Sequence, residues 1–419
     1  MLKSFTVQKF KSIQDQTLDL GQLNVIIGTN GSGKSNLLEA FGMYSMAVEG
    51  RITYQGMSAR GMRLSTPEVF KSAFAGNRRS MNFHLGGVFG VPDGLTYSVD
   101  VTSKKDEPEA TAWGFHQERL KTAKPKRRLA FRNNSGVKLE GVDTPKPLKR
   151  EEGILQRAEA LGVLSDVHAK ALSAVKQYAI YAPSTLILRG VDEDRSHKSP
   201  LGLYGGNMAA TANSWIDTSP KNNLFANSRK NARTIFLELI DWATYITVAT
   251  PELELQASHV HTGSLVLTFK DRFMLEKFKS LYAYDVSEGA LYVLFVLMLL
   301  LHPETPPVLA LDNVDSSLNP GLIRNLMVKI AGILDQQPER QIFLTTHNPT
   351  ALDGLDLFHP QHRLFVAKRH PQHGYTQFER VQPPPGMTRD QWGEQHGEMK
   401  LSEIWLSGAL GGVAPPLGM

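Results

Sequence analysis

The sequence predicts an α/β fold with a mainly parallel core sheet and an additional group of antiparallel strands. The first observation is an apolar run at 23–27 that leads into a glycine-rich octapeptide and then a helical pattern. The second is an apolar strand at 308–311, a helix at 322–334 and an apolar strand at 341–346, an order that joins parallel strands. The third is a stretch at 290–301 that is apolar on all sides, which predicts a fully buried helix.

Composition sets the limits of the interpretation. The chain has 419 residues, of which 41% are hydrophobic and 21% charged, as in globular domains. It has no cysteine, which excludes disulfides, thiolate metal sites and cysteine nucleophiles. A net charge of +5 permits contact with nucleic acid without requiring it. The N-terminus has no apolar signal core and the run at 290–301 is too short to cross a bilayer, so we expect a soluble, cytoplasmic protein without membrane contact.

The octapeptide Gly28-Thr29-Asn30-Gly31-Ser32-Gly33-Lys34-Ser35 fits the phosphate-loop pattern G-x-x-x-x-G-K-[ST]. Glycines let the backbone turn its N–H groups toward phosphates, Lys34 adds a positive charge, and Ser35 offers a hydroxyl to Mg²⁺. The predicted nucleotide-binding residues here are Asn30, Gly31, Ser32, Gly33, Lys34, Ser35 and Asn36. A chance glycine-rich turn is the alternative, but the flanking strand and helix argue against it.

Two further polar groups follow predicted core strands. Asp312 comes directly after the strand at 308–311, and His347 directly after the strand at 341–346. Ligand groups of open α/β sheets gather at the carboxyl ends of parallel strands. We therefore expect Lys34, Asp312 and His347 to converge on one edge of the sheet.

Hydrophobic periodicity and composition predict the structure of the segments between these motifs. Met81–Val88 and Leu95–Val101 are predicted to form an antiparallel hairpin. Lys121–Arg150 is basic and poor in apolar residues, which indicates a loop or a solvated face. Helical patterns follow at Glu151–Tyr178 and Ala226–Ile246.

Four segments now stand in order: the phosphate loop, Ser287-Glu288-Gly289 before the apolar helix, Asp312 with Ser316-Ser317-Leu318-Asn319-Pro320, and Thr346-His347-Asn348-Pro349. This set resembles the ATP-binding cassette (ABC) ATPases of the RecF, SMC and OLD type. The resemblance covers about 1–125 and 264–412 and includes the motif Phe10-Lys11-Ser12. Two more segments match: Phe115-His116-Gln117-Glu118-Arg119-Leu120, and Tyr181-Ala182-Pro183 at the place of the γ-phosphate-sensing loop.

The resemblance implies an ABC-type ATPase head with ATP and Mg²⁺ as ligands. Lys34 and Ser35 would hold the triphosphate and metal, Asp312 would be the Walker B carboxylate on Mg²⁺, and His347 would lie near the γ-phosphate. The signature motif would be Ser287, Glu288 and Gly289, which in such ATPases covers the nucleotide held by a second subunit. A homodimer closed by ATP is therefore expected.

The resemblance also divides the chain into three parts. Residues 1–125 would carry the phosphate loop and the antiparallel strands. Residues 126–262 would form a basic loop and a helical insertion between the phosphate loop and the signature motif. Residues 263–419 would carry the signature, the Walker B strand, the switch histidine and a C-terminal tail.

One departure from the family concerns hydrolysis. The family usually has glutamate directly after the Walker B aspartate, as the base that orients water, whereas this chain reads Asp312-Asn313-Val314-Asp315. Asn313 cannot accept a proton, although it can orient water, and Asp315 is an alternative carboxylate. We expect slow hydrolysis and long-lived ATP-bound heads.

A further likeness concerns the biological role. The sequences at 311–320 and 401–412 resemble those of PtuA-like ATPases from Septu and some retron anti-phage systems. These ATPases work beside a separate effector, which is often an HNH nuclease. Only 72 residues follow His347, too few for a typical added nuclease domain, so a nuclease would come from a partner chain. The alternatives are a RecF-like repair ATPase that clamps DNA directly, with DNA or RNA on the basic run, and a subunit that never hydrolyses its ATP.

Two remaining features receive simpler interpretations. His359, His362, His370 and His373 are close in sequence, but no carboxylate stands at ligand spacing, so an exposed loop is expected rather than a zinc site. Trp405 lies between Ile404 and Leu406 and is expected to anchor the tail to the core.

Overall fold

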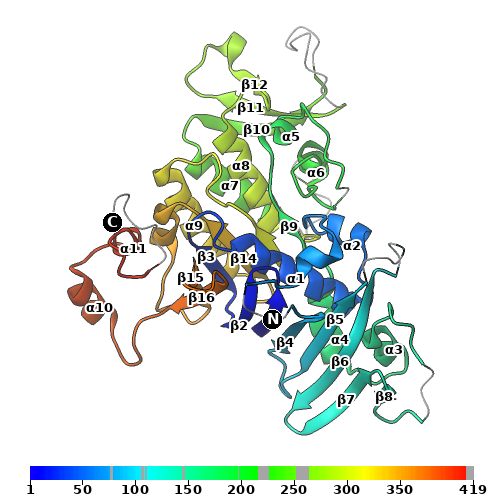
Figure 1. The fold of residues 1–419 in the computed structure, drawn as a ribbon. Coiled ribbons are helices and arrows are strands. Elements are labelled where there is room, and N and C mark those ends of the chain that lie inside the picture. The colour runs from blue at the N-terminus through cyan, green and yellow to red at the C-terminus, as the bar shows by residue number, and fades with distance from the viewer. Residues whose placement is uncertain are drawn as a thin grey trace.

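The computed structural model describes residues 1–75, 79–104, 108, 111–143, 147–196, 198–215, 226–251 and 264–411, with the side chains of 226–229 excluded. The predicted domain boundary at 262–263 and the end of the resemblance at Gly412 lie outside these ranges. Figure 1 shows the parallel strands in the middle of the molecule, with a small sheet at one end and a group of antiparallel strands at the other.

A single large mixed sheet runs through most of the chain. In spatial order its strands are β8 (Gly136–Leu139), β7 (Lys126–Asn133), β6 (Trp113–Ala123), β5 (Thr96–Ser103), β4 (Asn82–Phe89), β1 (Leu2–Phe10), β2 (Ile13–Asp19), β16 (Thr376–Val381), β15 (His362–Arg369), β3 (Leu23–Ile27), β14 (Gln341–Thr346), β13 (Val308–Leu311) and β9 (Ile180–Tyr181). Strands β15, β3, β14, β13 and β9 are parallel, and the sequence expectation of a parallel core is confirmed.

The central strands β3, β13 and β14 are buried at every position because both faces of the sheet are covered. On β13, Leu309 and Leu311 pack into one core, while Val308 and Ala310 pack into the other. The covering helices are α1 (Lys34–Glu49) on one face, and α8 (Glu288–Leu301) and α9 (Pro320–Asp335) on the other. All of 290–301 is buried, as its uniformly apolar sequence predicts.

The remaining helices are short and surround this centre. They are α2 (Tyr54–Ser58), α3 (Ile154–Ala160), α4 (Asp166–Lys176), α5 (Thr185–Leu188), α6 (Met208–Trp215), α7 (Ala226–Leu239), α10 (Arg389–His396) and α11 (Leu401–Leu406), with the 3₁₀ turns η1 (Pro67–Phe70), η4 (Glu276–Phe278) and η5 (Pro349–Gly354). No helix in the described ranges is both long and apolar enough to cross a membrane.

The predicted hairpin is confirmed, but the basic run after it is not a loop. Strands β4 and β5 pair antiparallel, and β6, β7 and β8 extend the same sheet. Lys126, Arg127 and Arg128 on β7 are exposed, so the solvated-face alternative holds for this strand, whereas Leu129 and Ala130 are buried. The boundary drawn between 125 and 126 cuts the β6–β7 hairpin. The basic composition did not indicate these strands, because only one face of each strand packs on the core and the other face carries charged side chains.

Both long predicted helices extend beyond the helices of the structure. The first divides into α3 and α4, because Gly162 adopts φ 69° after α3 and Ser165 caps the start of α4. The second ends as a helix at Leu239, and β10 (Ala243–Ala249) follows. This strand pairs with β11 (Val266–Asp271), which pairs with β12 (Ser280–Tyr282), so pairing with β11 places this segment in a second, three-stranded sheet.

The segment after His347 completes the core. Strand β15 pairs with β3, and β16 pairs with β15, so both belong to the large sheet. Trp405 on α11 is 7% exposed and packs into the core that contains α8, as predicted. The Asp353 carboxylate accepts hydrogen bonds from the Ser402 N–H and hydroxyl, both at 2.9 Å, which fixes α11 on η5.

Candidate nucleotide site

The phosphate loop lies at the carboxyl end of β3 and leads directly into α1. Gly33 adopts φ 107°, and a Cβ at this position would lie 2.1 Å from Thr376 Oγ1, so only glycine fits. The Thr376 hydroxyl donates to the Ser32 carbonyl at 2.8 Å and lies 2.7 Å from Ser12 Oγ. Strand β16 and the β1–β2 turn therefore brace the loop from behind.

The predicted loop residues divide into supporting and open groups. Asn36 donates its amide to Ser12 Oγ at 2.7 Å, so it helps to fix the loop. Asn30 and Gly31 are exposed at the tip, and nothing lies within 4 Å of a Cβ built on Gly31. The tip is therefore open on the side where a phosphate would approach.

Lys34 is folded back onto its own loop. Its amine donates to the Gly28 carbonyl at 2.7 Å and the Thr29 carbonyl at 3.1 Å, and lies 3.3 Å from His347 Nδ1. Burial lowers the pKa of Lys34 to about 8, against the opposing pull of Asp312 and Asp315. A cation held this way in a polar loop is positioned for an anion that would restore its ordinary pKa.

Asp312 stands opposite Ser35. Ser35 Oγ donates to Asp312 Oδ2 at 3.0 Å, and the Thr345 hydroxyl donates to Asp312 Oδ1. The Asp312 N–H also donates to the Tyr181 carbonyl at 3.0 Å, which ties the end of β13 to β9. The predicted convergence of Lys34, Asp312 and His347 is therefore confirmed.

These donors fit the ligands that a P-loop implies. A hydroxyl and a carboxylate oxygen 3.0 Å apart suit Mg²⁺, a hard cation that takes one or two protein oxygens and keeps several waters. Ser32 Oγ is buried inside the loop without a hydrogen-bond partner, which leaves a polar group available to a phosphate oxygen. The residues that would hold the phosphates and the metal are thus the loop N–H groups, Lys34, Ser35 and Asp312.

The segment after Asp312 has a constrained backbone. Asn313 adopts φ 56°, a region that asparagine tolerates better than most residues. Its N–H donates to Thr345 Oγ1 at 2.8 Å, and its carbonyl accepts from the Tyr292 hydroxyl at 3.2 Å. These two bonds fix the backbone of Asn313 and leave its side-chain amide free of any hydrogen bond in the described part of the chain.

Asp315 and His347 lie together on the same edge. The His347 N–H donates to Asp315 Oδ1 at 3.3 Å. Partial burial and then the charge of Lys34 lower the pKa of His347, so its ring is neutral at pH 7 and can accept at Nδ1 from the Lys34 amine. Asp315 is thus placed beside the histidine that follows β14.

The predicted signature residues lie apart from the loop. Ser287 caps α8 without a side-chain hydrogen bond and is exposed. The Glu288 carboxylate accepts from the hydroxyls of Ser317 and Thr185, and these bonds lower its pKa. Gly289 faces the Ser317 carbonyl, 3.1 Å from where a Cβ would stand. Within the described ranges no hydrogen bond or ion pair joins 287–289 to the phosphate loop, so these residues do not complete the site within one chain.

The sequence reading missed the residues that hold the site in place. Thr345 connects Asp312 with Asn313, and Thr376 connects the loop with Ser12. Arg369 donates to the Gly31 carbonyl at 2.8 Å. Thr345 stands in the strand before His347 and could have been suspected, whereas Thr376 and Arg369 carry no signal because they reach the loop from β15 and β16.

Two family models match this chain. Residues 184–353 match the model described as AAA domain, putative AbiEii toxin, Type IV TA system. Residues 1–46 match the model described as AAA ATPase domain. No curated protein sequence matches the chain.

Three solved structures of SMC heads are similar to this chain. An SMC head bound to the C-terminal winged-helix domain of ScpA has 15% identity and a TM-score of 0.52, over 91% of this chain and 97% of that one. The SMC head domain from Thermotoga maritima has 13% identity and a TM-score of 0.44, over 91% and 99%. The Smc head bound to the C-terminal domain of ScpA from Pyrococcus furiosus has 13% identity and a TM-score of 0.48, over 91% and 96%. Only the first exceeds a TM-score of 0.5, and at its identity it shows the fold alone.

The architecture and the loop together define the class of protein. The chain has the α/β fold of an SMC-like ABC ATPase head, with a large mixed sheet and a small antiparallel sheet. Two parts of the chain match models of AAA ATPase domains, which are P-loop nucleoside triphosphatases, a class that generally uses ATP with Mg²⁺.

Proposed function

We propose that this head binds ATP and Mg²⁺ at the edge formed by the phosphate loop, Asp312 and His347. The observation that carries the proposal is the 3.0 Å contact between Ser35 Oγ and Asp312 Oδ2, beside the Lys34 amine, because these groups come from opposite parts of the chain. Phosphoryl transfer depends mainly on positioned charge, which this edge supplies.

Each residue has a distinct task in this proposal. Lys34 leaves the loop carbonyls and places its charge on the phosphates. Ser35 and Asp312 would hold the metal, and the metal would supply positive charge to neutralise charge that develops on the transferred phosphate. The neutral His347 ring, beside Asp315, accepts or donates one hydrogen bond near the terminal phosphate.

Slow turnover is the second part of the proposal. Asn313 stands where the family has a glutamate and its amide cannot take a proton from water. Asn313→Asp adds a carboxylate to a residue type that also tolerates positive φ, while Asn313→Glu extends it. We expect both variants to hydrolyse ATP faster than the wild type and Asp315→Ala to hydrolyse it more slowly. Unchanged rates in both Asn313 variants, with ATP still bound, would contradict the slow-switch idea.

The third part is a homodimer closed by nucleotide. The signature residues 287–289 make no contact with their own phosphate loop, and exposed Ser287 leaves the first N–H groups of α8 uncapped by a side chain. Such a helix start attracts anions. Light scattering with ATP and Mg²⁺ should show a dimer for the wild type and a monomer for Ser287→Arg. Ser135→Arg, in the exposed β7–β8 turn, is the matched control and should dimerise normally.

The biological proposal is a sensor or regulatory scaffold for a partner nuclease in bacterial anti-phage defence, of the PtuA-like type. Its support is the sequence resemblance, together with the toxin-associated description of the model that matches 184–353. A pull-down of the native complex, with bound protein and nucleic acid identified, tests it. Recovery of a stoichiometric nuclease supports it, and recovery of the head alone on DNA favours the RecF-like alternative.

A direct DNA clamp is the alternative with an observation in its favour. Lys126, Arg127 and Arg128 are exposed basic residues at the start of β7, of which Arg127 pairs with Glu140. Replacement of all three by alanine should weaken DNA binding and reduce its salt dependence if the clamp is correct. An ATP-loaded subunit that never hydrolyses is the other alternative, and the Asn313 series distinguishes it from the slow enzyme.

A further inference from the structure

Three side chains with metal-ligating atoms meet at the opposite edge of the parallel strands. Asp335 ends α9, His359 lies just before β15, and His362 is the first residue of β15. Their ligand atoms all lie within 4.8 Å of one another. His359 Nε2 is 3.5 Å from Asp335 Oδ1, and the two imidazole rings are 4.1 Å apart between centroids. Two imidazoles and a carboxylate are a donor set that Zn²⁺ takes.

The sequence reading of this cluster needs correction. His362 is 7% exposed and belongs to a core strand, so it does not lie on an exposed loop. Asp335 supplies the carboxylate that was absent at ligand spacing, from a helix earlier in the chain. The sequence could not show this cluster, because only the tertiary fold brings the end of α9 close to His359 and the start of β15.

One separation in this cluster matches a zinc centre, and all of its ligand atoms lie within 4.8 Å of one another. Zn–N bonds of about 2.0 Å and Zn–O bonds of about 2.1 Å place neighbouring tetrahedral ligands roughly 3.4 Å apart. The 3.5 Å separation of His359 Nε2 and Asp335 Oδ1 already meets this value. Asp335 is exposed at a helix end, so its carboxylate can move inward without disturbing packed neighbours.

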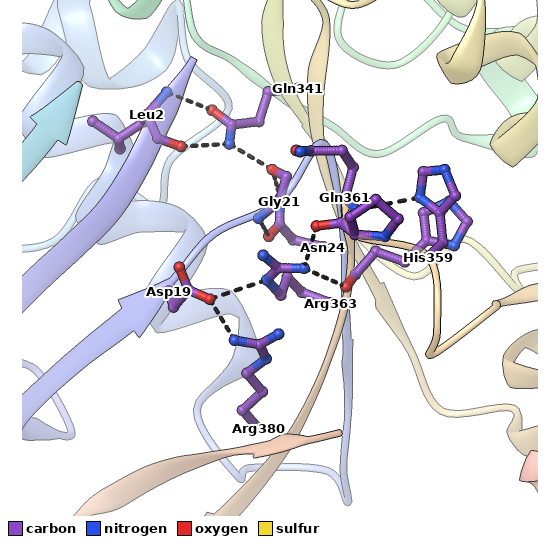
Figure 2. A network of polar contacts seen from close by, with 11 residues as sticks. Leu2, Asp19, Gly21, Asn24, Gln341, His359, Gln361, Arg363 and Arg380 are labelled. Atoms are coloured by element: carbon purple, nitrogen blue, oxygen red, sulfur yellow. Dashed lines mark hydrogen bonds and ion pairs between the residues drawn. The ribbon is translucent and has the colours of Figure 1, made fainter. Parts of the chain in front are cut away.

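The histidine loop is held firmly by its own backbone. The Gln361 carbonyl accepts from the N–H groups of Gln22 at 2.8 Å and Leu23 at 3.1 Å. Gly21 permits this approach, since a Cβ there would lie 2.2 Å from the same carbonyl oxygen. Figure 2 shows His359 and Gln361 beside Gly21, Asn24 and Arg363 in this network. The two rings are therefore positioned without any ion.

The hydrogen bonds of Nδ1 in each imidazole ring indicate which ring nitrogen carries the proton. His362 Nδ1 lies 3.2 Å from the Asp356 carbonyl and 3.3 Å from the Asp356 N–H, and in the tautomer that donates to the carbonyl the Nε2 lone pair is left for a metal. Burial and the neighbouring His359 lower the pKa of His362, which favours the neutral form. His359 Nδ1 accepts from the Gln361 N–H at 3.2 Å, so its own proton is at Nε2, facing Asp335. Metal binding at Nε2 moves that proton to Nδ1 and breaks this one contact.

We propose that Asp335, His359 and His362 form a zinc site separate from the nucleotide site, with a fourth position for water or for a ligand from a partner. On β15, His362 pairs with Leu23 and Val366 pairs with Ile27 beside the phosphate loop. Four residues of strand place the two sites roughly 13 Å apart. The ion ties the end of α9, the helix that follows the Asp312 segment, to the first residue of β15.

The chain contains its own control for this proposal. His370 and His373 have the same three-residue spacing, and their rings stack at 4.7 Å between centroids. They are exposed or half-buried, and no acidic residue joins them into a ligand group in the part of the chain that the structure describes. A pair of nearby histidines alone should therefore not bind zinc as tightly.

The test uses the full-length chain freed of metal with a chelator and then titrated with Zn²⁺ against a chromophoric competitor. We expect one tight Zn²⁺ per chain in the wild type, and affinity at least about tenfold weaker in His359→Ala and in Asp335→Asn. The double variant His370→Ala/His373→Ala should bind like the wild type. Co²⁺ in place of Zn²⁺ should give the visible absorption of a four-coordinate site in the wild type only.

Thermal unfolding supplies a second readout that does not depend on ATPase activity. Zn²⁺ should raise the unfolding temperature of the wild type and of the His370/His373 variant, but not that of His359→Ala. His359 is half-buried at the surface, so this variant should fold where a change at buried His362 could fail. Equal zinc affinity in wild type and His359→Ala, or a loss confined to the His370/His373 variant, would overturn the proposal.

Discussion

The two edges of the parallel sheet differ in which of their buried polar groups are paired. At the carboxyl edge, Ser32 Oγ is buried without a partner and the pKa of Lys34 is lowered. At the amino edge, buried Gln341 donates to the carbonyls of Leu2 and Gly21 and accepts from the Leu2 N–H. Figure 2 shows these paired contacts. The carboxyl edge keeps an unpaired hydroxyl and a buried cation beside the phosphate loop, while at the amino edge the Gln341 side chain is fully paired and the unpaired buried atoms are Gln361 Oε1 and Arg340 Nε.

The largest expected effect is at the carboxyl edge. Asp312→Ala removes a proposed metal ligand and the acceptor of both Ser35 and Thr345. We expect affinity for ATP with Mg²⁺ to fall about 100-fold, since each charged hydrogen bond contributes about 1.5–3 kcal/mol. Fluorescent-nucleotide titration with and without Mg²⁺ measures this. An unchanged affinity would break the assignment of function to this edge.

A large stability effect with little effect on binding is expected at the amino edge. Gln341→Ala removes the side-chain partner of the Leu2 N–H and carbonyl, and one of two donors to the Gly21 carbonyl, which keeps Asn24 Nδ2 at 2.9 Å. We expect the unfolding free energy to fall by about 2–3 kcal/mol. Denaturant unfolding measures the loss, and nucleotide affinity should change less than about twofold. Gln336→Ala, at an exposed glutamine after α9, is the control and should be near neutral. A parallel loss of nucleotide affinity would show that the two edges are coupled.

The pH dependence of nucleotide binding sharpens the comparison further. The Lys34 amine of the free chain loses its charge as pH rises through about 8, whereas bound phosphate would favour the charged form. Binding should therefore take up a proton above pH 8, and affinity should fall by up to about tenfold per pH unit. Below pH 8 the Lys34 amine is charged in the free and the bound chain, so it adds no pH dependence to nucleotide affinity. Calorimetry in buffers of different ionisation enthalpy measures the uptake, and its absence at pH 9 would exclude Lys34 as the phosphate contact.

The smallest effect is expected from the exposed ion pairs of the amino edge. Asp19 accepts from Arg363 at 3.2 Å and from Arg380. Its side chain is 57% exposed, so Asp19→Asn should cost about 0–1 kcal/mol of unfolding free energy. The loss should shrink between 0.1 M and 1 M salt. A cost above about 2 kcal/mol would mean that this pair, and not buried Gln341, organises the edge.

Prediction from sequence succeeded where a short pattern has one physical meaning. The apolar strands at 308–311 and 341–346 end at Asp312 and His347, and the structure brings both to Lys34. Prediction from sequence failed where only one face of a strand packs on the core, or where pairing with a distant strand determines the secondary structure. The basic run that contains β7 was predicted to be a loop or a solvated face, without its strands. Residues 243–246 were predicted as the end of a helix, although their pairing with β11 makes them part of a strand.

The candidate site shows the same division. The residues that would touch phosphate and metal follow from the octapeptide and from the ends of the strands. Their supports, Thr345, Thr376 and Arg369, reach the site through β14, β15 and β16, and no local pattern marks them. The type of a side chain shows which chemistry the residue can perform, but it does not show which distant residues hold that side chain in position.

The sequence by itself determined the parallel core, the buried helix and the polar groups at the carboxyl edge, because apolar periodicity and strand ends are local properties. The tertiary structure alone decided how the basic strands extend the sheet and how Asp335 meets His359 and His362. Those arrangements depend on strand pairing and helix packing between distant segments, whose free energy is not contained in any one stretch of the chain.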